Sequence, residues 1–191
     1  MFITPIEIFD MLLMIAVVGF IFKDTFKTPV KQNDELSKYL RKSRFNWDDF
    51  WFAAMVTAPA ILLHELGHKI IALNYGLSAV FNAAYIWLIV AVILKLISFP
   101  FIFFVPAYVQ IIGAATTTQH TLIAFAGPGV NLILFLLALI ITKTQKLKTK
   151  KLHFWVLTKN INLFLLIFNL LPIPGFDGYQ VFSGLWKIFG L

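Results

Sequence analysis

The chain has 191 residues, of which 60% are hydrophobic and 13% charged, and its mean hydropathy is +0.85. A soluble domain averages about 45–50% apolar and about 25% charged residues, so this composition excludes an ordinary soluble domain and predicts a membrane protein. The formal net charge of +7 comes from two loops and therefore bears on orientation in the membrane, not on nucleic acid. Cysteine is absent, which excludes disulfides and thiolate metal ligands and leaves the redox compartment open.

Apolar runs fill most of the chain, and a run of about 20 residues can cross a bilayer as a helix. The first run, residues 11–22, lacks the basic flank and small-residue cleavage site of a secretory signal, so we expect a retained span. Glu7 and Asp10 precede it and are expected to form an acidic flank. Residues 23–49 then form a polar loop with seven Lys/Arg and five Asp/Glu.

The second span is predicted at residues 50–75 and contains the sequence HELGH at residues 64–68. Ionisable side chains at membrane depth are costly, so three of them together indicate a function. On a helix, His64 and His68 lie one turn apart on one face, where two imidazoles can share a tetrahedral zinc ion. Glu65 is then the candidate general base for a zinc-bound water.

Residues 79–112 are the hardest part of the chain to assign. Lys95 interrupts the apolar run, and Pro100 and Pro106 break the residues after it. A re-entrant segment or a tight pair of short helices fits this pattern better than one clean crossing. We therefore expect no net crossing of the membrane in this segment.

Two further apolar runs complete the chain. Residues 121–142 contain the sequence GPGVN, residues 154–171 end in PIPGFDG, and a loop with five lysines separates the two runs. No internal repeat or linker is found, so we expect one membrane-embedded domain, residues 1–191, with its core at residues 50–180. The expected fold is an all-α polytopic bundle of about five to six transmembrane or re-entrant helices.

A catalytic zinc ion usually has three protein ligands, so HELGH requires a third ligand from elsewhere in the chain. Asn74 stands where an extended HExxHxxGxxH pattern has a histidine, and residues 66–176 contain no carboxylate. Asp177 lies on a segment broken by Pro and Gly, which lipid tolerates only inside the protein or beside a wet cavity. Asp177 is therefore the favoured third ligand. His120 and His153 are the alternative ligands, and the alternative role of the segment around Asp177 is an ordinary interfacial turn.

The HELGH motif, followed much later by NLLPIPGFDG at residues 169–178, resembles the paired signature of the site-2 protease family of intramembrane zinc metalloproteases. The second motif of that family has the form NxxPxPxxDG, and this chain matches every fixed position. The GPGVN sequence at residues 127–131 is similar to the middle-helix motif of the family. The likeness covers residues 50–180 and points to an archaeal-type subgroup that lacks PDZ and regulatory domains.

The resemblance implies that His64, His68 and Asp177 hold one Zn²⁺ per chain and that Glu65 is catalytic. It also implies contacts with the substrate or the oxyanion for two asparagines, Asn169 and Asn131. Apart from the resemblance, a buried asparagine can equally join helices by hydrogen bonds.

The expected activity is hydrolysis of a peptide bond in or near a transmembrane helix of a membrane protein, as in regulated intramembrane proteolysis. The expected partners are that substrate and the lipid bilayer, without nucleic acid, and the expected location is the cell membrane, crossed several times. A metal-ion transporter would need several polar positions along a path, and the sequence has one cluster. An inactive scaffold relative would be expected to have lost Glu65 or a ligand, and all four residues are present.

The basic loops predict an orientation. Short loops rich in Lys and Arg are usually cytoplasmic, so residues 23–49 and 143–151 are expected on the cytoplasmic side, with the N-terminus outside. The acidic flank before the first span agrees with this orientation. Analogy with bacterial members of the family points the other way.

Overall fold

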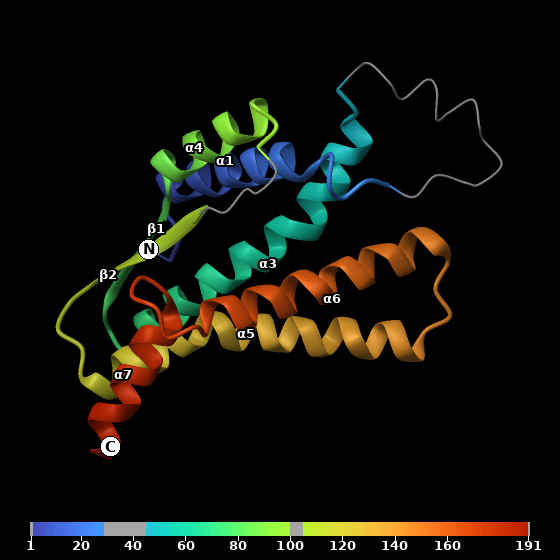
Figure 1. Ribbon diagram of the computed structural model, residues 1–191. Coiled ribbons are helices and arrows are strands. Elements are labelled where there is room, and N and C mark those ends of the chain that lie inside the picture. The colour runs from blue at the N-terminus through green and yellow to red at the C-terminus, as the bar shows by residue number, and fades with distance from the viewer. Residues whose placement is uncertain (1, 29–44, 100–104, 191) are drawn as a thin grey trace, which may run out of the picture.

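The computed structural model describes residues 2–28, 45–99 and 105–190 (Figure 1). Within these ranges the chain forms six helices and two strands. In chain order they are α1 (Pro5–Phe22), α3 (Trp47–Asn74), β1 (Ser78–Ala83), α4 (Tyr85–Leu96), β2 (Ala107–Ile112), α5 (Thr117–Thr144), α6 (Thr149–Asn169) and α7 (Asp177–Phe189). The predicted helical membrane bundle is confirmed, with a two-stranded sheet in addition.

Among the described residues, three helices are long and apolar enough to cross a membrane, namely α1, α3 and α5. At about 1.5 Å per residue, a 28-residue helix such as α3 or α5 is about 42 Å long and exceeds the ~30 Å hydrocarbon core. These helices coincide with the predicted runs at residues 11–22, 50–75 and 121–142. The protein is therefore a membrane protein.

Side chains cap the starts of α1, α3 and α5. Thr4 and Glu7 form a capping box at the start of α1, and Thr116 and Gln119 form another at the start of α5. Asn46 accepts hydrogen bonds from two backbone N–H groups in the first turn of α3. Helix α6 returns antiparallel along α5, and after a break at the Pro/Gly-rich segment α7 packs against α5 (Figure 1).

For residues 79–112 we expected a re-entrant segment or a pair of short helices, and the described part of this segment contains one helix, not two. Strands β1 and β2 occupy the two ends of this segment, and helix α4 follows β1. The strands pair antiparallel, from Ser78↔Ile112 to Ala83↔Ala107, so the chain returns to its starting point, consistent with no net crossing. The two strands were not predicted, because strands depend on partners distant in the sequence, which the pattern within one run cannot reveal.

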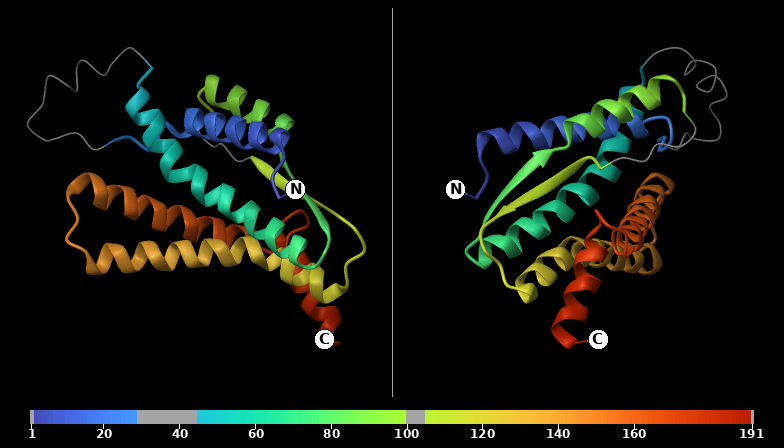
Figure 2. Two further views of the ribbon diagram at one scale, coloured as in Figure 1. Left: turned by 180° about the vertical axis from the view of Figure 1, so that it is seen from behind. Right: turned by 60° about the vertical axis from the view of Figure 1, so that its left-hand side comes forward.

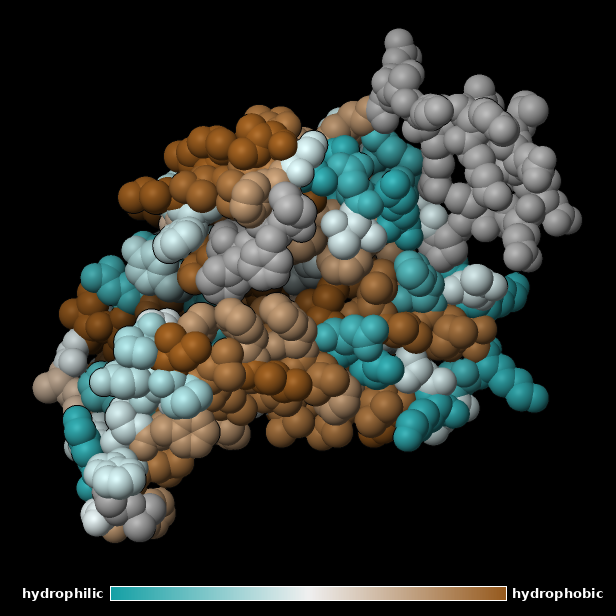
Figure 3. All heavy atoms as spheres, in the orientation of Figure 1, coloured by the Kyte–Doolittle hydropathy of each residue, from teal (hydrophilic) through white to brown (hydrophobic). Residues whose placement is uncertain are grey.

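The hairpin of β1 and β2 lies between α1 and α3 (Figure 2). Its apolar core joins these elements through Met11, Met14 and Val18 of α1, Phe81 of β1 and Ala107 of β2. On the outside of the molecule, apolar side chains cover much of the surface (Figure 3). This arrangement suits a protein surrounded by lipid.

Three ionisable side chains bind the edge of β1 that faces away from β2. The Phe81 N–H donates to Glu7 (2.7 Å), and the Ala83 N–H donates to Asp10 (3.1 Å). Lys69 of α3 donates to a backbone carbonyl of β1 (2.8 Å) and forms an ion pair with Glu7. All three ionisable side chains are at most 2% exposed.

Glu7 and Asp10 are therefore not the solvated acidic flank that we expected. They lie within α1, are buried, and satisfy backbone N–H groups of a strand edge that lipid could not satisfy. The expected orientation in the membrane accordingly depends on the two basic loops alone.

Candidate active site

His64 and His68 lie one turn apart on α3, both buried, with their Nε2 atoms 3.1 Å apart. The Nδ1 atom of His64 is 2.7 Å from the side-chain oxygen of Asn131, and the Nδ1 atom of His68 is 2.7 Å from the carbonyl oxygen of Ile123. An oxygen acceptor at Nδ1 fixes the proton there in a neutral imidazole. Each Nε2 therefore keeps its lone pair free, and both face the same point.

Asp177 brings a carboxylate to that point from the first residue of α7. Its Oδ2 atom is 3.1 Å from His64 Nε2 and 3.3 Å from His68 Nε2. Ligand atoms of the three residues all lie within 4.8 Å of one another. Two imidazole nitrogens and one carboxylate oxygen are a donor set that catalytic zinc commonly takes, so the residues present fit the metal.

The break between α6 and α7 allows Asp177 to reach the histidines. Gly175 has φ +98°, a conformation that favours glycine. At Gly178, an added Cβ would lie 2.5 Å from the carbonyl oxygen of Leu171 and still closer to Leu170. Helix α7 can therefore start directly against the end of α6 only because Gly178 has no side chain.

Glycines also set the distance between α3 and α5. A Cβ at Gly67 would lie 2.9 Å from a methyl of Val130 and 3.0 Å from the carbonyl oxygen of Ala126. A Cβ at Gly127 would lie 2.6 Å from His64 Nε2. The backbone of α5 thus lies directly beside the histidine nitrogens that would bind a metal.

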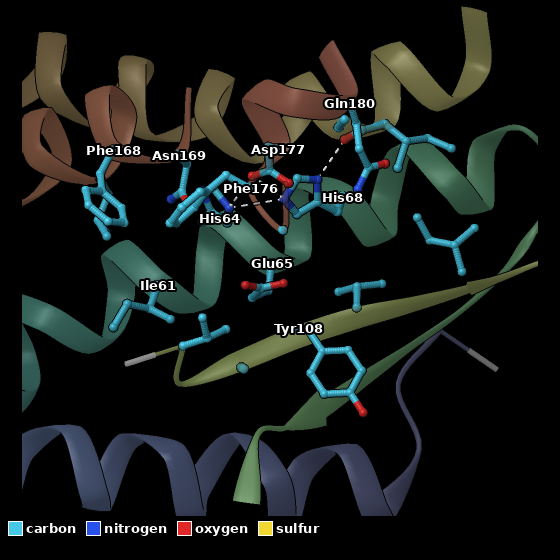
Figure 4. A pocket seen from close by; sticks show the side chains of 18 of the residues that line it. Ile61, His64, Glu65, His68, Tyr108, Phe168, Asn169, Phe176, Asp177 and Gln180 are labelled. Atoms are coloured by element: carbon cyan, nitrogen blue, oxygen red, sulfur yellow. Dashed lines mark hydrogen bonds and ion pairs between the residues drawn. The ribbon is translucent and has the colours of Figure 1, made fainter. Parts of the chain in front are cut away.

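Glu65 and the three clustered residues line one cavity of about 380 Å³ (Figure 4). The Val109 backbone N–H of β2 lies beside the carboxylate of Glu65. The remaining walls are mainly apolar and come from α1, α3, β2 and the residue Val105 before it, α5, α6 and the segment before α7, with Phe22, Ile61, Ile123, Phe164, Phe168 and Phe176 among them. The ionisable groups are therefore gathered in an otherwise apolar chamber.

The edge of β2 that faces away from β1 opens toward this cavity. Backbone groups of an antiparallel strand point alternately to its two edges. Phe81 and Ala83 of β1 direct their N–H groups to α1, so the residues between them face β2. By the register, the β2 residues that point away from β1 line the cavity, and these are Ala107, Val109 and Ile111.

Comparison with known proteins identifies the family. The chain is 37% identical over 152 residues to the "Putative zinc metalloprotease MJ0611" of Methanocaldococcus jannaschii, and this match covers 74% of the chain and 76% of that protein. The chain belongs to the site-2 protease family of zinc metalloproteases. It is 32% identical over 136 residues to the "Putative zinc metalloprotease Rip2" of Mycobacterium tuberculosis, covering 63% of the chain and 51% of that relative's length. No family model and no solved structure matches the chain.

The chain is thus a metalloprotease and a membrane protein, and the alternative histidines lie outside the cluster of side chains that could hold a metal ion. Among the described residues, that cluster consists of His64, His68 and Asp177. His153 instead stacks its ring on Phe52, with 5.7 Å between the ring centroids. The third candidate ligand is accordingly the carboxylate that the sequence favoured.

The two asparagines implicated by the resemblance occupy different places. Asn169, the last residue of α6, lines the cavity of the metalloprotease. Asn131 is fully buried, does not line the cavity, and hydrogen-bonds to His64 from behind. This position suits orientation of the His64 ring, and the contact of Asn131 with substrate or oxyanion that the resemblance implied stays a prediction.

Sequence reasoning missed several residues of this metalloprotease. Gln180 lines the cavity because it lies three residues after Asp177 on one helix face, a spacing that could have indicated it (Figure 4). Tyr108 and Val109 could not be found in this way, because their place depends on the pairing of β2. Asn162 stands out in the sequence as a polar residue in an apolar run, but the sequence does not indicate that it hydrogen-bonds to Asn131.

Proposed function

We propose that this metalloprotease is an intramembrane zinc endopeptidase that hydrolyses a peptide bond in or near a transmembrane helix of a membrane protein. The observation that carries the proposal is the meeting of His64, His68 and Asp177 beside Glu65, in an apolar cavity between helices long enough to cross a membrane. Water and a metal would be brought together there at membrane depth, where a helical substrate presents its backbone.

His64, His68 and Asp177 would hold one Zn²⁺ per chain, through two Nε2 atoms and a carboxylate oxygen. Zinc in such a site supplies Lewis-acid polarisation of a carbonyl oxygen and lowers the pKa of water to about 7. The hydrogen bonds at both Nδ1 atoms support this role, since in a neutral imidazole they place the proton on Nδ1 and leave Nε2 to bind the metal.

Glu65 would accept a proton from the attacking water and deliver it to the leaving amine nitrogen. It follows His64 directly in α3 and lines the same cavity, which supports this assignment. Asn169 also lines the cavity, and its amide would donate a hydrogen bond to the developing oxyanion.

The substrate would bind as an extended strand. A transmembrane helix engages its backbone in i→i−4 hydrogen bonds, so it must unwind locally before its scissile bond can be attacked. The open edge of β2 offers backbone donors and acceptors to such a strand. Because Val109 already contacts Glu65, a strand added there would lie next to the proposed base.

The proposed setting is the cell membrane, crossed several times by α1, α3 and α5. Cleavage at that depth would release the soluble part of a membrane-anchored substrate, as regulated intramembrane proteolysis requires. The lipid bilayer and the transmembrane substrate would then be the partners of the protein.

The test is cleavage of a single-span substrate protein in lipid vesicles that contain the purified protein. We expect cleavage that stops with a zinc chelator, returns when zinc is added, and is absent with Glu65→Gln. Zinc transport into the vesicles without cleavage would favour a metal-ion transporter instead. Substrate binding without cleavage by the zinc-loaded wild type would favour an inactive scaffold.

A further inference from the structure

A buried chain of hydrogen bonds runs from His64 across three helices. Asn131 on α5 and Asn162 on α6 are 0% and 1% exposed. The Asn131 side-chain oxygen is 2.7 Å from His64 Nδ1, and the Asn131 Nδ2 atom donates to Asn162 Oδ1 at 3.0 Å. The Nδ2 atom of Asn162 in turn donates to the carbonyl oxygen of Thr158 at 2.8 Å, on its own helix.

This series of hydrogen bonds fixes the orientation of the Asn131 side-chain amide. Its Nδ2 carries two hydrogens, and two oxygens accept them, the carbonyl oxygen of Ala60 at 3.1 Å and Oδ1 of Asn162. The amide oxygen must therefore face His64. Asn162 cannot present its own nitrogen to Asn131 instead, because that nitrogen is donating to Thr158.

The orientation of Asn131 selects the tautomer of a neutral His64 imidazole. An amide oxygen only accepts, so in the neutral imidazole His64 Nδ1 must carry the proton, and this tautomer leaves Nε2 with the lone pair that a metal needs. His68 reaches the same state through a backbone carbonyl, that of Ile123. The tautomer of His64 thus depends on the side chains of Asn131 and Asn162, whereas that of His68 depends on a backbone carbonyl.

We infer that Asn162 is a positioning residue that, through Asn131, holds His64 in the form that binds the metal and thereby raises zinc affinity. This inference depends on the proposed role of His64 as a zinc ligand. Partners behind a metal ligand typically change affinity by about 10–100-fold, and an indirect partner is expected at the low end. The alternative is a purely structural role, in which Asn162 only holds α6 against α5 by its hydrogen bond.

The test measures zinc dissociation constants of purified full-length protein by chelator competition. Asn162→Leu removes the acceptor for Asn131 at similar volume and is expected to weaken zinc binding about tenfold. Asn162→Asp keeps an acceptor oxygen and is expected to retain most of the affinity. Asn160→Leu is the matched control, because Asn160 lies two residues away on the exposed side of α6, and it should bind zinc like the wild type.

A double-mutant cycle separates positioning from helix packing. If Asn162 acts on His64 through Asn131, Asn162→Leu should have little further effect on zinc affinity in a protein that already carries Asn131→Ala. Equal losses in both backgrounds, or a lower unfolding temperature of the metal-free protein with unchanged zinc affinity, would overturn the inference. If Asn162→Leu cannot be purified folded, Asn162→Ala takes its place in the cycle.

The outcome for the wild type distinguishes this inference from the proposed function. A wild type that binds zinc, with Asn162→Leu binding it equally well, refutes the positioning role and leaves the zinc site intact. A wild type that binds no zinc refutes the proposed function and the positioning role together.

Discussion

Gly127 of α5 lies so close to His64 of α3 that a Cβ added to the glycine would be 2.6 Å from His64 Nε2. That Cβ would be closer still to Nε2 of His68. A metal ion shared by the two histidines would therefore lie directly against the backbone of Gly127, where any side chain would occupy its space.

The first prediction is that Gly127→Ala abolishes zinc binding and proteolysis. The new methyl group would occupy the space in front of both Nε2 atoms, and neither helix can withdraw without breaking the contact at Gly67. Metal content and substrate cleavage measure the effect. Gly129→Ala is the control, since its Cβ would approach nothing nearer than a ring carbon of Phe125 at 3.7 Å, and it should keep both properties. Full zinc content in Gly127→Ala would contradict the proposed ligand arrangement.

The second prediction is that Glu65→Gln stops proteolysis while zinc stays bound. The substitution removes a base and leaves the three proposed ligands in place, so the rate should fall by about 10²–10⁴-fold, the usual contribution of general acid–base catalysis. Cleavage assays and metal analysis of the same preparation decide the matter. Zinc lost together with activity would make Glu65 a ligand and revive the transporter alternative.

The third prediction is that Asp177→Asn lowers zinc occupancy, because a neutral amide is a poorer zinc ligand than a carboxylate. His120→Ala and His153→Ala are the controls and should keep metal and activity, since both residues lie outside the cluster. Metal analysis after dialysis against a weak chelator reports the difference. Full occupancy in Asp177→Asn, with zinc lost from a histidine control, would refute the assignment of the third ligand.

The fourth prediction concerns the buried ion pair between Glu7 and Lys69. Glu7→Gln leaves the Lys69 charge unpaired in an apolar core and is expected to cost about 3–5 kcal/mol of unfolding free energy. The double substitution with Lys69→Met should recover part of that loss. Asp24→Asn is the control, because the Asp24 side chain, which pairs with Lys23 and Lys95, is half exposed, so each of these pairs should contribute at most about 1 kcal/mol. Unfolding in mixed detergent micelles gives these values, and equal costs at both pairs would contradict the prediction.

The fifth prediction concerns orientation, for which the basic loops and the analogy with bacterial relatives disagree. The start of α3 and the end of α5 lie on one side of the molecule (Figure 1), so the loops at residues 23–49 and 143–151 should share a side. By the charge rule that side is the cytoplasm. Ser43→Cys, at a position outside the described residues, and Thr149→Cys are labelled singly with an impermeant reagent on intact cells. Neither should react.

Labelling at both cysteines would reverse the orientation and keep the loops together. Labelling at one alone would place the loops on opposite sides, which requires an odd number of crossings in residues 79–112 and contradicts the return of the chain to β2. The absence of cysteine in the natural sequence makes each label specific.

The sequence by itself determined the long helices and indicated the metal centre. Apolar runs long enough to cross a bilayer fold locally into helices, because lipid leaves backbone groups no other partner. The spacing within HELGH places His64 and His68 on one helix face whatever the rest of the chain does. Asp177 could be favoured as third ligand because residues 66–176 offer no carboxylate, which is informative only in a chain so poor in charge.

Tertiary structure decided everything that depends on contacts between distant segments. The strands at Ser78–Ala83 and Ala107–Ile112 exist because they pair with each other and because side chains from α1 and α3 bind the outer edge of β1. The place of Asn131 behind His64 likewise depends on how α5 crosses α3. Such contacts have no local signature, since hydrogen bonds and close packing between helices depend on relative position in space and not on distance along the chain.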